Sequence, residues 1–147
     1  MAESSAHTFT ASLHWEGGRD GAGQLQTAAL RTAISVRAAL SGPGQGTSPE
    51  ELLLGAAAGC YAITLAGLLQ RMRIPVASLH LLSEATVEAG GTLRVVRIVH
   101  RPRVTLGPGA DVARARSAPA LAEEHCMISR AIRGNVEVAV EPELIPG

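Results

Sequence analysis

The chain has 147 residues, of which 46% are hydrophobic and only 2% aromatic, so we expect a single domain over residues 1–147 with an aliphatic core. Its formal net charge is +0, and all 13 basic residues are arginine. Nucleic-acid-binding proteins need clustered basic charge and usually stacking aromatic rings, so this composition argues against that class. Two cysteines are too few to form a zinc site by themselves, which leaves inert core thiols or redox chemistry.

The N-terminal third is predicted to form β-strands. Loose alternation of polar and apolar residues indicates short strands over 7–16, 23–29 and 32–38. A glycine-rich turn, Gly17–Gly21, separates the first two strands and contains Arg19. Residues 41–46 are rich in glycine and are expected to form a flexible loop.

A long helix is predicted to follow, from Pro49 to about Met72. Ser48 can cap it, proline suits the first helical position, and Glu51 completes the pattern of a capping box. Residues 52–70 carry no charge, so the helix is apolar on all sides and should be buried. A helix of about 24 residues would be about 36 Å long, which a chain of this size cannot easily enclose. We therefore expect a second subunit to cover part of it.

The rest of the chain is predicted to form a hairpin, two helices and a last strand. β-Branched residues indicate strands over 77–88 and 92–106. A helix is expected from about Ala110 to Glu124, with Pro119 as a weak point. A short helix over Cys126–Ile132 and a strand over Asn135–Val140 should follow. This order of elements predicts an α+β fold with an antiparallel sheet.

The expected location is the cytoplasm. The first ten residues lack the basic segment followed by an apolar segment that marks a secretory signal. No uninterrupted apolar run reaches about 18 residues, so we expect no membrane-spanning helix. A permanent structural disulfide is not expected in a reducing compartment.

The two cysteines are the residues most suited to chemistry. Cys60 lies in the middle of the apolar helix, and Cys126 lies beside His125 at the start of a short one. Either could be a small buried side chain, which is common for cysteine. Together they suit a pair in which one thiolate attacks a peroxide and the other thiol condenses with the resulting sulfenic acid to a disulfide. A Cys126–His125 nucleophile pair is disfavoured because sequence neighbours rarely have that geometry.

A buried Cys60 needs help to ionise, because desolvation disfavours the thiolate. An arginine would supply fixed positive charge, and Arg19 and Arg37 are the two candidates. Glu50 could orient such an arginine, although its charge is also favourable in the first turn of a helix. Ten residues separate Glu50 from Cys60, about 15 Å along one helix, so they can share a site only across two subunits. Three other histidines, His14, His80 and His100, show no metal-ligand spacing and are interpreted as strand-face residues.

Several separated segments resemble the OsmC/Ohr family, which comprises osmotically inducible protein C and the organic hydroperoxide resistance proteins. The central-helix motif is matched by Thr47–Leu52 and Gly59-Cys60, and the second-cysteine motif by Cys126–Ala131 with Gly134-Asn135-Val136. The N-terminal motifs are matched by His14–Gly17, as in OsmC-type members, and by Gly17–Gly21, as in Ohr-type members. The resemblance covers nearly the whole chain.

The resemblance implies antiparallel β-sheets packed around a long buried central helix in an intertwined homodimer. It implies a peroxidatic role for Cys60 and a resolving role for Cys126, with Arg19 and Glu50 positioning and activating Cys60. By the same resemblance, members of the family reduce organic hydroperoxides, such as fatty-acid or alkyl hydroperoxides. Members of the Ohr type are re-reduced by lipoyl dithiols. No metal, haem or flavin cofactor is implied.

Three departures from the family pattern leave alternatives open. The N-terminal motifs mix the OsmC and Ohr types, which leaves the reductant and the preferred substrate open. Met127 stands where a proline usually follows the second cysteine, and Arg37 occupies the position from which OsmC-type members take their arginine, so it is held in reserve behind Arg19. A different cysteine-dependent enzyme, such as a hydrolase, would need a histidine or acid near Cys60. An OsmC-like protein that binds or senses a small ligand would need neither thiol, and a wide separation of the cysteines would favour it, since a disulfide needs Cα atoms within about 7 Å.

Overall fold

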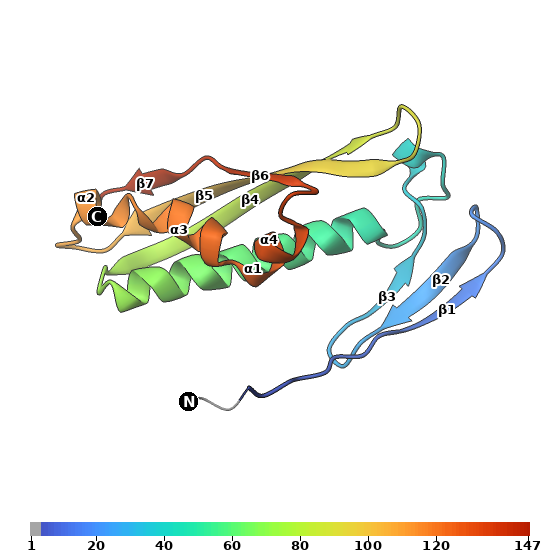
Figure 1. Ribbon diagram of the computed structural model, residues 1–147, viewed down its shortest axis with the longest axis horizontal. Helices are drawn as coiled ribbons and strands as arrows, with labels where there is room; N and C mark the ends of the chain where they lie inside the picture. Colours follow the sequence, from blue (N-terminus) through green and yellow to red (C-terminus); the bar gives the residue numbers. More distant parts are fainter. Residues whose placement is uncertain (1–3) are drawn as a thin grey trace. The chain divides into compact units, whose positions relative to one another are not determined.

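The computed structural model describes residues 4–147 of the chain, and Figure 1 traces their path. The chain divides into two compact units, Met1–Leu52 and Leu53–Gly147. The first unit contains the predicted N-terminal strands and the start of the long helix. The second unit contains the rest of that helix and both cysteines.

An antiparallel three-stranded sheet in the order β1-β2-β3 forms the first unit. The strands are β1 (Ser12–Glu16), β2 (Ala22–Gln26) and β3 (Arg31–Ile34). Leu13 lies opposite Leu25, and Trp15 lies opposite Gly23, so apolar residues share one face of the sheet. The three predicted strands are confirmed, but each is shorter than expected.

Turns explain the shorter strands. The Thr27 N–H donates to the Leu30 carbonyl oxygen at 2.8 Å, which closes a turn directly after β2. A 3₁₀ helix over Ala38–Leu40 follows β3, where the strand was expected to continue. In the turn before β2, Gly17 has a φ of 93°, and a side chain at Gly21 would collide with the Glu16 carbonyl oxygen. Glycine is therefore required at both positions.

The loop over 41–46 was expected to be flexible, but hydrogen bonds hold it against the residues that follow β3. The Ser35 hydroxyl donates to the Gln45 carbonyl oxygen and accepts from the Gln45 N–H, both at 2.7 Å. The Gly44 N–H donates to the Val36 carbonyl oxygen at 2.9 Å. Ser35 is itself buried, so the loop has a fixed anchor.

The long helix α1 (Pro49–Arg71) begins as predicted. The Ser48 hydroxyl accepts the Glu51 N–H at 3.3 Å, which confirms the cap. The Glu51 carboxylate does not return to Ser48 as in a capping box; it accepts from the Thr47 hydroxyl at 3.1 Å and pairs with Arg37 at 3.4 Å.

Within the second unit, α1 buries one face. Its buried residues follow a four-residue spacing: Ala57, Tyr61, Leu65 and Leu69. The opposite face is exposed, with Ile63 76% accessible. Burial on all sides is therefore not reached within this chain, and its completion by a second subunit stays a prediction.

By length and composition alone, α1 is apolar enough to cross a membrane, contrary to our expectation for this chain. Glycines and Thr64 interrupt the run of strongly apolar residues in α1, but the mean hydropathy of the helix remains high despite them. The core helix of a soluble protein meets the same criterion, and α1 contributes Tyr61, Leu65 and Leu69 to the largest core cluster of its unit.

The sheet of the second unit is mixed. Strands β4 (Val76–Glu88) and β5 (Arg94–Leu106) form the expected antiparallel hairpin. Strands β6 (Glu137–Val140) and β7 (Glu143–Ile145) both pair with β5 in parallel, so the sheet of the predicted α+β fold adds parallel pairing to the expected antiparallel pairing. The reason is the helical crossover between β5 and β6, which returns the chain to the start of β5 before β6 begins.

Short helices make that crossover (Figure 1). They are α2 (Val112–Ala115), α3 (Ala118–His125) and α4 (Met127–Ile132). The single helix expected up to Glu124 is thus two helices, and Pro119 lies in the first turn of α3, where its missing N–H costs no hydrogen bond. The core of the unit joins α1 to the inner face of β5 and to α3, through Val104, Leu106 and Ala122 among others.

Candidate active site

The fold brings Cys60 and Cys126 together. Cys60 is half-buried in α1, Cys126 is fully buried at the junction of α3 and α4, and both are free thiols. Burial raises the pKa of Cys60, but hydrogen bonds from the Ile128 N–H, the Cys126 thiol and the Met127 N–H outweigh it. The net pKa of Cys60 lies below its ordinary value, so its thiolate is favoured.

Thr64 makes the smallest contribution to lowering that pKa. Its hydroxyl donates to the Cys60 carbonyl oxygen at 2.8 Å, one helical turn earlier, so its single hydrogen is already engaged. The main donors to the Cys60 sulfur are therefore groups of the segment that begins at Cys126.

Main-chain hydrogen bonds fix the position of Cys126. It is the N-cap of α4, and its sulfur accepts the Ser129 N–H at 3.5 Å. Its carbonyl oxygen accepts the Arg130 N–H at 2.9 Å, and its own N–H donates to the Glu123 carbonyl oxygen at 3.3 Å. These main-chain hydrogen bonds therefore fix the position of Cys126 within the core cluster against which Cys60 packs.

A buried polar chain that sequence reasoning missed lies next to Cys60. The Tyr61 hydroxyl donates to the Pro119 carbonyl oxygen at 3.1 Å, and the Tyr61 ring stacks on His100 with centroids 4.6 Å apart. His100 Nδ1 lies 2.7 Å from the Ser83 hydroxyl. The available signal was a lone tyrosine in an apolar helix, since a buried tyrosine hydroxyl usually has a partner.

Burial also shifts the acid–base properties of that chain. It raises the pKa of Tyr61, and the negative charges of Glu123 and of ionised Cys126 add to the increase. Burial lowers the pKa of His100, although Glu123 partly opposes this. Both side chains are therefore neutral near pH 7, and His100 Nε2 is buried without a hydrogen-bond partner.

The charged residues predicted for the site belong to the first unit. Arg19 donates to the Leu40 carbonyl oxygen at 3.0 Å. Arg37 donates to the Gly46 carbonyl oxygen at 2.9 Å and pairs with Glu51. Within residues 4–147 Glu50 pairs with neither arginine, and its Oε2 is buried without a partner. That Arg19, Arg37 or Glu50 acts on Cys60 stays a prediction.

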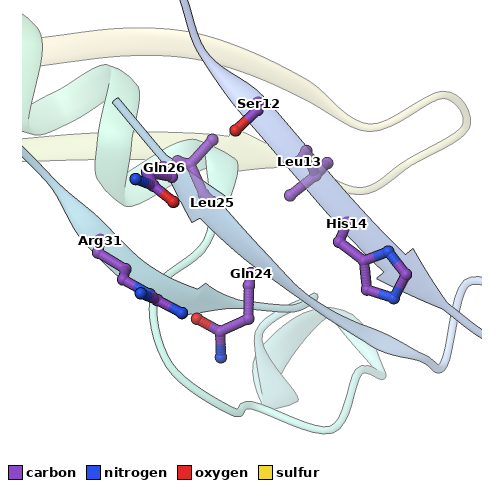
Figure 2. A pocket seen from close by; sticks show the side chains of 7 residues that line it. All are labelled: Ser12, Leu13, His14, Gln24, Leu25, Gln26 and Arg31. Carbon is purple, nitrogen blue, oxygen red and sulfur yellow. The ribbon is translucent and has the colours of Figure 1, made fainter. Parts of the chain in front are cut away.

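A hollow among the three strands of the first unit does not suit the predicted chemistry. It has a volume of about 300 Å³, and Figure 2 shows side chains of β1, β2 and β3 around it. Its polar lining includes His14, Gln24 and Arg31, and neither cysteine belongs to it. Across the described residues 4–147, no group of three or more His, Cys, Asp or Glu side chains could hold a metal ion.

Comparison with known proteins identifies the family. The family model described as OsmC-like protein matches residues 42–141, a segment that includes both cysteines. The chain belongs to the OsmC-like protein family. Two structures with this fold are the organic hydroperoxide resistance protein OsmC of Legionella pneumophila (TM-score 0.79, 25% identity, 95% of this chain and 99% of that one) and OhrB of Bacillus subtilis (TM-score 0.71, 24% identity, 92% and 98%).

The sequence relatives of this OsmC-like protein include organic hydroperoxide resistance proteins. It is 43% identical to the uncharacterized protein YmaD of Bacillus subtilis over 139 residues, which covers 92% of this chain and 93% of YmaD. It is 28% identical over 143 residues to the organic hydroperoxide resistance protein of Xanthomonas axonopodis pv. citri, which covers 95% and 98%. These relationships support a redox role in peroxide defence.

Proposed function

We propose that this OsmC-like protein is a cytoplasmic thiol peroxidase that reduces organic hydroperoxides, with Cys60 as the peroxidatic and Cys126 as the resolving cysteine. The proposal rests on the packing of Cys60 against the core cluster that contains Cys126, combined with the lowered pKa of Cys60, to which the Cys126 thiol contributes. A peroxidatic cysteine needs both features, since the thiolate is the nucleophile and a second thiol must be within reach.

The reaction balances with an external dithiol as the reductant. The Cys60 thiolate attacks the O–O bond of ROOH, the alkoxide takes up a proton to leave as ROH, and Cys60 becomes a sulfenic acid. The Cys126 thiol then displaces water from the sulfenic acid, which forms the Cys60–Cys126 disulfide. An external dithiol, such as a lipoyl group, returns both cysteines to thiols and is itself oxidised to a disulfide.

The proposal places the active site at the interface of a homodimer. One subunit supplies Cys60 and Cys126, and the other supplies Arg19, or Arg37 in reserve, together with Glu50. Two observations support it: α1 leaves an apolar face exposed around Ile63, and Glu50 keeps an unpaired carboxylate oxygen. An arginine beside the sulfur would stabilise the thiolate and donate to the departing oxygen.

The test is a single-turnover reaction of the reduced protein with cumene hydroperoxide, followed by counting of free thiols. Wild-type protein is expected to consume one equivalent of peroxide and lose both thiols. Cys60→Ser should not react, and Cys126→Ser should react once and then stall or over-oxidise. If the wild type keeps both thiols in excess peroxide, the peroxidase proposal fails and a role in binding or sensing a small ligand takes its place.

A further inference from the structure

Cys126 is the single extended residue between two helices. Helix α3 ends at His125 and α4 begins at Met127, while Cys126 itself has φ −65° and ψ 121°. A lone extended residue at the end of a helix is a natural hinge, because small changes in its dihedral angles swing one helix against the other. A contact that spans this corner would restrict that swing and, with it, the movement of the Cys126 thiol.

The side chain of Arg133 makes such a contact. Arg133 directly follows α4, and its Nη2 donates to Glu123 Oε1 at 2.7 Å and to the Glu123 carbonyl oxygen at 3.2 Å. That carbonyl oxygen is the same atom that accepts the Cys126 N–H. One guanidinium nitrogen therefore ties the end of α4 to the end of α3, with Cys126 between them.

This ion pair is less exposed than the others. The Glu123 side chain is 19% exposed, whereas the acidic partner is at least 50% exposed in every other ion pair among residues 4–147. Attraction between charges is screened less where water is excluded, so this pair should restrain its surroundings more than a pair at the open surface.

The start of α3 is anchored separately. There the Pro119 carbonyl oxygen accepts the hydroxyl of Tyr61, the residue after Cys60 in α1. Cys60 in turn packs against the core cluster that contains Cys126. With the start of α3 tied to the helix of the first cysteine, the corner at Cys126 is the part whose angle decides where the second thiol lies.

We propose that Arg133 is a positioning residue for disulfide closure: with Glu123 it holds the α3–α4 corner at the angle that keeps the Cys126 thiol within reach of Cys60. The inference rests on the proposed function in that it takes the two cysteines to be disulfide partners. Arg133 acts through the corner and not on the reacting sulfurs. Its loss should therefore slow the attack of Cys126 on an oxidised Cys60 and leave the first attack by Cys60 unchanged.

The experiment separates these two steps without a peroxide. Reduced protein is mixed with dithiodipyridine in a stopped-flow instrument, and the released thiopyridone is followed by its absorbance. Cys60, half-buried where Cys126 is fully buried, reacts first. Its thiolate attacks the S–S bond of the reagent, which forms a mixed disulfide and releases one thiopyridone, at a rate that rises with reagent concentration.

The second phase reports the position of Cys126. The Cys126 thiol gives up its proton to the solvent and attacks the Cys60 sulfur of the mixed disulfide, which releases the second thiopyridone and forms the Cys60–Cys126 disulfide. This step is intramolecular, so its rate does not depend on reagent concentration. Cys126→Ser should release one thiopyridone and lack the second phase.

Arg133→Gln is expected to slow the second phase about fivefold, which corresponds to about 1 kcal/mol, and to leave the first phase unchanged. Arg133→Lys should recover most of the rate, since it keeps a cationic donor. Arg103→Gln is the matched control: it breaks the exposed ion pair with Glu143 on the sheet of the same unit and should match the wild type in both phases.

Three results would overturn the inference: an unchanged second phase in Arg133→Gln, equal slowing of its two phases, or the same slowing in Arg103→Gln. Glu123→Gln covers the case in which Arg133→Gln does not fold. It should slow the second phase as well, because an amide binds a guanidinium less strongly than a carboxylate does, and an unchanged second phase there would count against the inference equally.

Failure of the inference is distinguishable from failure of the proposed function. A wild type that closes the disulfide with dithiodipyridine but consumes no hydroperoxide would end the peroxidase proposal and leave the role of Arg133 intact. A wild type that does both, with an Arg133→Gln variant that closes its disulfide equally fast, would end the inference alone.

Discussion

The hydroxyl of Tyr61 donates a hydrogen bond to the carbonyl oxygen of Pro119 at 3.1 Å, within the core of the second unit. Tyr61 is the residue after Cys60 in α1, and Pro119 lies in the first turn of α3, the helix that ends at Cys126. Both residues are fully buried. One hydrogen bond therefore ties the helix of the first cysteine to the helix that presents the second.

Tyr61→Phe is expected to destabilise the fold by about 0.5–1.5 kcal/mol, because it removes one hydrogen bond between two buried residues. The ring and its stacking on His100 would remain, so the loss would report the hydroxyl alone. Urea unfolding measures the change, with Ser83→Ala as a comparison that breaks the other end of the polar chain. An unchanged free energy of unfolding in Tyr61→Phe would mean that the bond makes no net contribution.

Cys60 is expected to react as a thiolate at lower pH than an ordinary cysteine, because the hydrogen bonds from Ile128, Cys126 and Met127 outweigh the effect of burial on its pKa. The rate of alkylation at Cys60 against pH should therefore level off below the range of the same cysteine in the unfolded chain. Cys126→Ser keeps a donor and should preserve most of this shift, whereas Cys126→Ala should raise the pKa. Equal titration of the two Cys126 variants would show that its thiol has no role in ionising Cys60.

Much of the fold could be predicted from local sequence patterns. The start of α1 at Pro49 follows from the cap at Ser48, and the β4–β5 hairpin follows from β-branched residues on either side of a glycine turn. The parallel direction of β6 and β7 could not be predicted, because strand direction depends on how the helices between β5 and β6 return the chain. Local patterns contain no information on that path.

The candidate site, like the fold, could be predicted only in part from the sequence. The two cysteines could be selected because few residue types do redox chemistry, and in the structure Cys60 packs against the core cluster that contains Cys126. The contact of Tyr61 with His100 could not be predicted, since alternation in β5 indicates that His100 faces inward but not which residue of α1 it meets. Nor could the main-chain donors at Met127 and Ile128, because every residue except proline carries an N–H.

His100 is expected to make the stability of the protein depend on pH. Burial lowers its pKa, so on acidification the unfolded chain takes up a proton near pH 6.5 while the folded chain resists until lower pH. Over that interval the unfolded state binds more protons, and stability therefore falls as the pH falls. Glu123 favours protonation and reduces the effect.

Thermal unfolding of wild type and His100→Gln over this pH range measures that contribution. The wild type should lose more stability than the variant on acidification, because glutamine can keep a hydrogen bond to Ser83 but does not titrate. If the two proteins lose stability in parallel, other groups account for the pH dependence and His100 does not.

Arg19→Ala should lower the single-turnover peroxidase rate at least tenfold, or about 1.4 kcal/mol of barrier, whereas Arg37→Ala should lower it less. The difference follows from how each side chain is already engaged. Arg37 pairs with Glu51 and donates to the Gly46 carbonyl oxygen, so its charge is partly neutralised and its loss should mainly loosen the loop before α1. Arg19 donates only to the Leu40 carbonyl oxygen and has no ion pair among residues 4–147.

Thermal unfolding of both variants separates the two effects. Arg37→Ala is expected to unfold at a lower temperature, and Arg19→Ala to unfold close to the wild type, since one exposed hydrogen bond contributes little. A larger rate loss in Arg37→Ala at unchanged stability would assign the activating role to Arg37. If neither variant loses tenfold, then neither Arg19 nor Arg37 activates Cys60, and the proposed activation scheme fails.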